Sequence, residues 1–134
     1  MPCLQDAKGG IEVYCVTKSF SFSAAHSLPS LPPEHKCHRL HGHNYVVEVC
    51  AGAHRLDRHG MVLDFANITQ AVAPLIASLD HQNLNDLFNF PTTSENIARH
   101  IFDECAKHFA PSAAHVEWVS VSETPKTKAI FSVR

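Results

Sequence analysis

The chain has 134 residues, of which 45% are hydrophobic and 18% are charged, and its formal net charge at pH 7 is −2. We therefore expect a single globular domain over residues 1–134, with a flexible N-terminal segment at 1–10. No apolar run approaches the roughly 20 residues that span a bilayer, and no basic stretch is present to follow a nucleic-acid backbone. The 5 cysteines lack paired spacing and the first residues lack a signal-peptide pattern, so we expect a cytoplasmic protein without membrane or nucleic-acid partners.

Two stretches with alternating apolar residues predict the first strands. Between residues 11 and 22, β-branched and aromatic residues are frequent and the apolar ones share one parity, which predicts a strand over 11–22 with His26 just beyond its end. A second strand is expected over 43–53, with His43 at its start. The proline-rich segment 28–33 predicts a loop between them.

A first helix is expected after a turn at residues 57–60. Asp64 is placed to cap it, and apolar residues recur at helical spacing as far as Leu79. These apolar positions are Phe65, Ile68, Val72, Leu75 and Leu79. Pro74 lies among them, and a proline ring clashes with the preceding turn at a cost of about 3 kcal/mol. We therefore expect a kink or an early end of the helix at Pro74.

A second helix has clearer limits in the sequence. Thr92 and Glu95 have the spacing of a capping box at its start, and Pro111 is expected to stop it. Its apolar stripe consists of Ile97, Ile101, Phe102, Cys105 and Phe109. Two short strands, at 116–123 and 128–133, are expected to close the chain as a hairpin.

The resulting order, ββααββ, favours the α+β class with an antiparallel sheet and both helices on one face. The other face of such a sheet needs a cover. We expect alternating apolar residues such as Val47 and Val49 to pack there against other subunits, which predicts a homo-oligomer.

Histidine is the unusual entry in the composition, with 11 copies against 11 for lysine and arginine combined. Side chains two residues apart in a strand project to one face, so His41 and His43 can offer two nitrogens to one metal ion. His26 can provide a third ligand if the first two strands form a hairpin. Three histidines would leave one tetrahedral position open for substrate, as in catalytic zinc sites; the alternative is that these are surface histidines of a polar loop.

Several other residues are candidates for proton transfer or binding. Cys37 can be a metal ligand, a buried small hydrophobe, or a nucleophile or base. Asp80 beside His81 can orient a proton-shuttling imidazole, although such pairs also occur in plain helix caps. Glu123 can face solvent or accept two parallel hydrogen bonds from an amino-heterocycle. The remaining cysteines, which we expect to be structural, are Cys3, Cys15, Cys50 and Cys105.

These residues occur within a set of motifs that resembles a known family. The motifs are Phe22-Ser23-Ala24-Ala25-His26, Cys37-x-x-x-His41-Gly42-His43-Asn44-Tyr45, Met61-Val62-Leu63-Asp64-Phe65, Leu79-Asp80-His81-x-x-Leu84-Asn85, Pro91-Thr92-Thr93-Ser94-Glu95-Asn96 and Ser122-Glu123-Thr124. In this order, over residues 11–132, they resemble the 6-pyruvoyl tetrahydropterin synthases and their bacterial 6-carboxytetrahydropterin synthase relatives. The resemblance implies the tunnelling fold (T-fold), in which trimers close a β-barrel with the helices outside and two trimers stack into a hexamer.

The resemblance also implies roles for individual residues. The zinc (Zn2+) ligands would be His26, His41 and His43. The proton acceptor would be Cys37, with Asp80 and His81 as its relay partners. The amino-pyrimidine edge of the pterin would be held by Glu123, with Thr93 and Ser94 lining the same pocket, and in such enzymes these groups come from adjoining subunits.

The branch of the family is indicated by the short spacing between Cys37 and His41. This spacing resembles that of the bacterial enzymes of queuosine biosynthesis, which implies conversion of 7,8-dihydroneopterin triphosphate to 6-carboxy-5,6,7,8-tetrahydropterin with loss of acetaldehyde and triphosphate. The alternatives are a 6-pyruvoyl tetrahydropterin synthase and a non-catalytic pterin-binding or zinc-binding module. His38 departs from the family pattern, in which a small residue commonly follows the cysteine. Cationic residues near the motifs, which are candidates to contact phosphate, are Lys36, Arg39 and Lys126.

Overall fold

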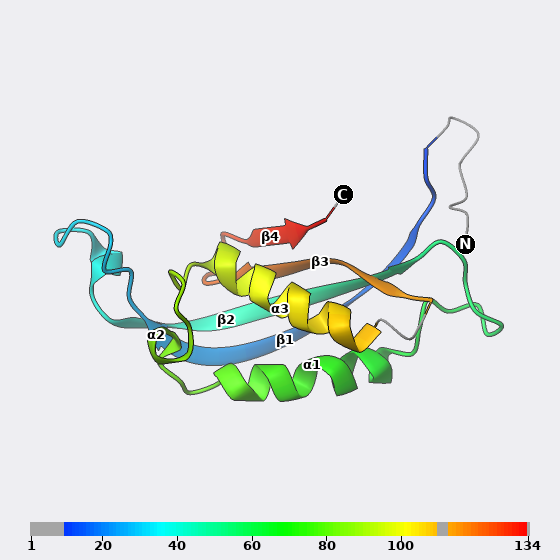
Figure 1. Cartoon of the computed structure of the whole chain (residues 1–134), viewed down its shortest axis with the longest axis horizontal. Helices are drawn as coiled ribbons and strands as arrows, with labels where there is room; N and C mark the ends of the chain where they lie inside the picture. Colours follow the sequence, from blue (N-terminus) through cyan, green and yellow to red (C-terminus); the bar gives the residue numbers. More distant parts are fainter. Residues whose placement is uncertain (1–9, 110–112, 134) are drawn as a thin grey trace.

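The computed structural model describes residues 10–109 and 113–133, and it confirms the α+β class (Figure 1). In chain order the elements are β1 (Tyr14–His26), the 3-10 helix η1 (Lys36–His38), β2 (His41–Ala53), α1 (Phe65–Leu79), α2 (Leu84–Leu87), α3 (Ser94–Phe109), β3 (His115–Ser122) and β4 (Ala129–Ser132). The strands form one antiparallel sheet in the order β1-β2-β3-β4. The predicted order therefore holds for the main elements, and η1 and α2 are short additions to it.

The β1–β2 hairpin extends further towards the connection between its two strands than the sequence predicts. Its register runs from Tyr14 opposite Ala53 to His26 opposite His41, so the expected end of the first strand at Phe22 is wrong. Residues 23–26 lack the β-branched and aromatic side chains that mark strands, and they are strand because β2 pairs with them.

Both long helices pack on one face of the sheet, as predicted. α1 contacts β1, and α3 contacts β3 and β4 (Figure 1). Val47 and Val49 are fully buried in the core on this face, so the expectation that they face other subunits is wrong. Because side chains alternate along a strand, the open face instead carries their neighbours Val46 and Glu48.

α1 begins as predicted and ends later than predicted. The Asp64 side chain caps it by accepting a hydrogen bond from Ala66 N at 2.8 Å. The helix continues through Pro74 to Leu79, so the early end expected at Pro74 is wrong. Pro74 and Gln70 are both exposed, and the Gln70 carbonyl that loses its helical partner can therefore bind water. Phe65, the first residue of α1, is half exposed and does not belong to the core.

α3 begins one residue later than its predicted cap implies. Thr93, not Thr92, caps it, and the Thr93 hydroxyl accepts a hydrogen bond from Asn96 N at 3.2 Å. The helix extends to Phe109, while Pro111 lies outside the described residues. β3 and β4 match the predicted strands to within one residue at each end. None of the described helices combines the length and apolarity that a membrane span requires.

Candidate metal centre

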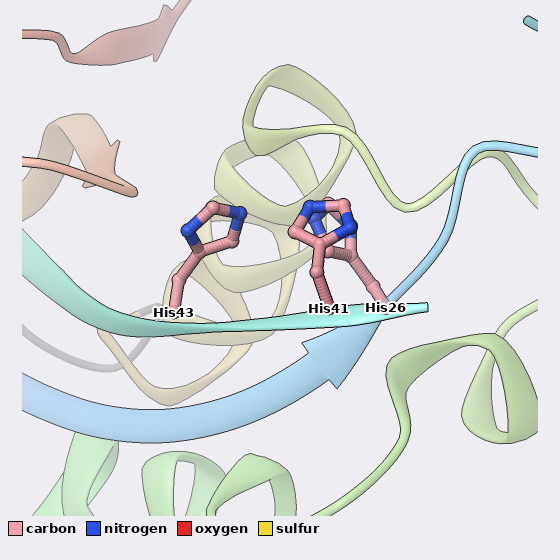
Figure 2. Close-up of side chains that lie close together, drawn as sticks. All are labelled: His26, His41 and His43. Carbon is pink, nitrogen blue, oxygen red and sulfur yellow. The ribbon is translucent and has the colours of Figure 1, made fainter. Parts of the chain in front are cut away.

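Three histidines converge where the β1–β2 hairpin ends (Figure 2). His26 is the last residue of β1, its cross-strand partner His41 is the first residue of β2, and His43 follows two residues later on the same face. Their ligand nitrogens all lie within 4.8 Å of one another, and the centroids of neighbouring rings are 4.6 to 5.2 Å apart. The hairpin assumed from the sequence therefore brings the predicted ligand set together.

The burial of these imidazoles favours a metal ion. The Nε2 atoms of His26, His41 and His43 are buried and have no hydrogen-bond partner among the described residues. A buried polar atom without a partner is costly, and a cation bound by the three nitrogens removes that cost. Burial also lowers the pKa of His26 and of His43, which favours the neutral imidazole that a metal requires. The donor set fits a divalent transition-metal ion.

Hydrogen bonds on the opposite ring nitrogens select the ligand atom. His26 Nδ1 lies 2.8 Å from the Thr92 carbonyl oxygen, and His41 Nδ1 lies 2.7 Å from the Arg39 carbonyl oxygen. A carbonyl only accepts hydrogen bonds, so each Nδ1 carries the proton and each Nε2 presents a lone pair. This is the arrangement in which outer partners orient metal-binding histidines.

Glu123 lies beside the histidines of its own chain. Its Oε2 is 3.5 Å from His43 Nε2, and its Oε1 is 4.0 Å from His26 Nε2. Ser94, the first residue of α3, donates its hydroxyl proton to Glu123 Oε1 at 2.9 Å. The predicted residues Glu123 and Ser94 are thus neighbours, whereas the Thr93 hydroxyl is used to cap α3.

The Asp80–His81 pair is attached to the outer edge of β1. Asp80 Oδ2 is 2.8 Å from His81 Nδ1, while Asp80 Oδ1 accepts a hydrogen bond from Ser23 N at 2.9 Å. The Ser23 carbonyl in turn accepts the His81 N–H at 2.6 Å, and His81 has a φ of 59°, a conformation that non-glycine residues seldom adopt. The Ser23 amide, and then the His81 ring, lower the pKa of Asp80 and keep it ionised.

A pocket of about 520 Å³ has both His81 and His43 among its lining residues. Ser23 and Asn44 form its wall between them, and the Ser23 hydroxyl donates to Asn44 Oδ1 at 2.7 Å. The pocket gives a small molecule access to the exposed imidazole of His81, whereas the Nε2 atom of His43 is buried near Glu123. An exposed imidazole paired with a carboxylate is suited to proton transfer.

Cys37 lies in η1, in the connection between β1 and β2. Its amide donates to His35 Nδ1 at 3.0 Å, and its carbonyl accepts the Leu28 N–H at 2.8 Å. No hydrogen bond among the described residues joins Cys37 to Asp80 or His81, so hydrogen bonds within one chain do not connect the predicted relay. His38 donates from Nδ1 to the Leu31 carbonyl at 2.9 Å and thereby fastens η1 to the proline-rich loop.

The remaining cysteines differ in their exposure. Cys50 and Cys105 are buried, and burial raises the pKa of each thiol to about 12, which suits the predicted structural role. Cys15 is exposed, and it lies close enough to Cys50 to contribute to the raised pKa of the Cys50 thiol. Cys3 lies outside the described residues.

Thr92 and Asn85 are the site residues that sequence reasoning missed. Thr92 is only 1% exposed and contacts His26, whereas the capping-box spacing had assigned it to the helix terminus. Asn85 hydrogen-bonds to the backbone of Ser27 next to His26. No local pattern signals either contact, because both join segments that are far apart in the chain.

Comparison with known proteins shows the family and the fold of this chain. The sequence model of the 6-pyruvoyl tetrahydropterin synthase family matches residues 15–133. An Archaeoglobus fulgidus protein provisionally named 6-carboxy-5,6,7,8-tetrahydropterin synthase is 44% identical over 66% of this chain and 73% of its own length. The Synechocystis protein of that name is 39% identical over 78% of this chain and 84% of its own. The structure of Caenorhabditis elegans 6-pyruvoyl tetrahydropterin synthase matches with a TM-score of 0.78 and 29% identity, covering 92% of this chain and 97% of that one.

The fold and the site together define a pterin-synthase-type enzyme with the T-fold. The chain belongs to the 6-pyruvoyl tetrahydropterin synthase family.

Proposed function

We propose that this protein is a zinc-dependent cytoplasmic lyase of queuosine biosynthesis. It converts 7,8-dihydroneopterin triphosphate and one water molecule to 6-carboxy-5,6,7,8-tetrahydropterin, acetaldehyde and triphosphate. The observation that carries the proposal is the convergence of three unpartnered Nε2 atoms beside Glu123. The choice of product is supported by the names of the Archaeoglobus and Synechocystis relatives and by the short spacing from Cys37 to His41.

His26, His41 and His43 would hold the zinc ion and leave one coordination position for substrate. When bound, zinc polarises the oxygens of the substrate side chain and makes the neighbouring C–H protons more acidic.

The residues around the metal centre supply binding and proton transfer. The Glu123 carboxylate accepts two parallel hydrogen bonds from the amino-pyrimidine edge of the pterin, and Ser94 fixes its orientation from the other side. Ionised Asp80 keeps the proton of His81 on Nδ1, which leaves Nε2 free to accept a proton from substrate. Cys37 is the second proton acceptor. Lys36 is close enough for its charge to act on His43, and it is our candidate for contact with the triphosphate.

Assembly would complete the site. Since Cys37 makes no hydrogen bond to Asp80 or His81 within a chain, we propose that they meet across an interface in a hexamer of two trimers. Co-expression of Cys37→Ala chains with His81→Ala chains tests this directly, because random pairing restores about a quarter of the sites. Recovery of activity in the mixture, from two inactive parents, supports a shared site; no recovery would contradict it.

Product analysis tests the reaction itself. Purified protein incubated with 7,8-dihydroneopterin triphosphate should release acetaldehyde together with carboxytetrahydropterin. The alternative, 6-pyruvoyl tetrahydropterin synthase, is favoured by the likeness to the Caenorhabditis elegans structure, and it would retain the side-chain carbons and release no acetaldehyde. Stoichiometric zinc binding with neither product would instead indicate a non-catalytic module.

The role of Cys37 has its own test. The Cys37→Ala variant should keep its zinc and lose turnover, because the thiol is not among the grouped metal ligands. Cys15→Ala, which changes an exposed thiol far along β1 from the site, is the matched control and should stay active. Retained activity in Cys37→Ala would exclude the thiol as proton acceptor.

A further inference from the structure

Asn85, in α2, holds the backbone next to the metal centre. Its Oδ1 accepts a hydrogen bond from Ser27 N at 2.9 Å, and its Nδ2 donates to Ser27 O at 2.9 Å. Both bonds form with only one orientation of the amide, so its oxygen and nitrogen are assigned without ambiguity. Ser27 directly follows His26. These two Asn85–Ser27 hydrogen bonds, which we call the Asn85 clamp, therefore fix the chain where it leaves the metal centre.

Thr92 extends this clamp to the imidazole itself. Its hydroxyl lies 3.3 Å from Asn85 Oδ1 and 3.4 Å from the Ser27 carbonyl oxygen, and it can donate to either. Its carbonyl accepts the proton of His26 Nδ1 at 2.8 Å. Thr92 and His26 are each only 1% exposed, so water does not substitute for these contacts.

The support of His26 is different in kind from that of His41. His41 Nδ1 donates to Arg39, two residues away, so this contact is local. His26 depends on Thr92, which is 66 residues distant and is held by Asn85. The orientation of His26 therefore depends on how the end of β1, α2 and the start of α3 are joined.

We propose that Asn85 and Thr92 are positioning residues that set the metal affinity of the three-histidine site, by keeping His26 in the orientation and tautomer that present Nε2. The inference rests on the proposed metal role of His26, His41 and His43. Loss of an outer partner of a metal-bound histidine typically weakens metal binding about 10–100-fold.

The test measures zinc affinity of the full-length protein by competition with a chelator of known affinity. The variants are Asn85→Ala and Thr92→Val, the latter of which removes one hydroxyl at nearly constant volume. Thr92→Ser, which restores the hydroxyl, should bind zinc like the unaltered protein. Asn89→Ala is the matched control, because Asn89 is exposed in the same segment between α2 and α3.

We expect zinc binding to weaken about 10–100-fold in Asn85→Ala and Thr92→Val, and to change less than about twofold in Thr92→Ser and Asn89→Ala. The visible spectrum of bound Co2+ should change in the first pair alone, which a general loss of stability would not produce. Zinc affinity equal to that of Asn89→Ala in both folded variants would overturn the proposal. If Asn85→Ala fails to fold, the zinc affinity of the milder variant Thr92→Val decides whether the proposal holds.

The outcome is separable from failure of the proposed function. If the unaltered protein binds zinc no more tightly than His41→Ala, the metal centre itself is wrong. If the unaltered protein binds zinc tightly and all four variants match it, only the positioning role fails.

Discussion

Removing the hydroxyl of Tyr45 should stabilise the zinc-free protein. Tyr45 is fully buried, and its hydroxyl has no hydrogen-bond partner among the described residues. Burial, and then the charge of Glu123, raise the pKa of Tyr45, so the hydroxyl stays protonated and cannot relieve its isolation by ionising. Its ring stacks on Phe22 with centroids 4.8 Å apart, and phenylalanine retains that contact.

The magnitude follows from what the substitution removes. A buried polar group without a partner costs about 1–3 kcal/mol, whereas loss of a satisfied hydrogen bond usually costs about 1 kcal/mol. We therefore expect Tyr45→Phe to raise the free energy of unfolding by about 1 kcal/mol, and Tm by about 3–5 °C for a domain of this size.

Urea titration of the zinc-free protein at neutral pH measures the change. Tyr14→Phe is the matched control, since Tyr14 is 52% exposed and should leave the stability unchanged. A loss of about 1 kcal/mol in Tyr45→Phe would show that the hydroxyl is paired and would refute the reasoning.

Three further predictions concern stability. Asp64→Ala removes the hydrogen bond from Ala66 N at the start of α1 and should lower the free energy of unfolding by about 1 kcal/mol, as measured by urea titration. An unchanged free energy of unfolding would mean that the Asp64 cap does not stabilise the protein. Pro74→Ala restores a helical N–H at an exposed position and should raise Tm, and a lower Tm would show that the restriction of the unfolded chain dominates. His100 packs against Phe88, and burial lowers the pKa of His100 below its ordinary value of 6.5. The unfolded chain therefore binds this proton more readily than the folded chain does. The free energy of unfolding should consequently fall as the pH decreases below about 6.5. His100→Gln should flatten that part of the curve of stability against pH; an unchanged slope would assign it to other groups.

The grouping of the three histidines could be predicted from the sequence because strand geometry determines where they point. His41 and His43 share a face in any strand, and His26 joins them once the hairpin pairs it with His41. The end of β1 could not be predicted, because Ser23, Ala24 and Ala25 have weak strand propensity and owe their conformation to β2.

The outer partners of the site lay beyond sequence reasoning for a different reason. Thr92 and Thr93 are adjacent and equally able to cap α3, and the contact of Thr92 with His26 decides between them. Such a choice depends on tertiary packing, which local patterns do not encode. Likewise, the family resemblance implies that Cys37 and His81 are partners, but it does not show that a single chain leaves them without a direct hydrogen bond.

The attachment of residues 80–83 to β1 restricts how copies of the chain can join. β1 is an outer strand of the sheet, and an outer strand offers its backbone groups to a neighbouring chain. His81 and Gln82 already bond to Ser23 and Ala25, so the last part of that edge is occupied. At the β1 edge, a strand from another copy can therefore extend the sheet along residues 14–22 only. Residues 80–83, which include Asp80 and His81, thus also determine where the pairing between β1 and a strand of another subunit must stop. That position is next to the pocket lined by His81.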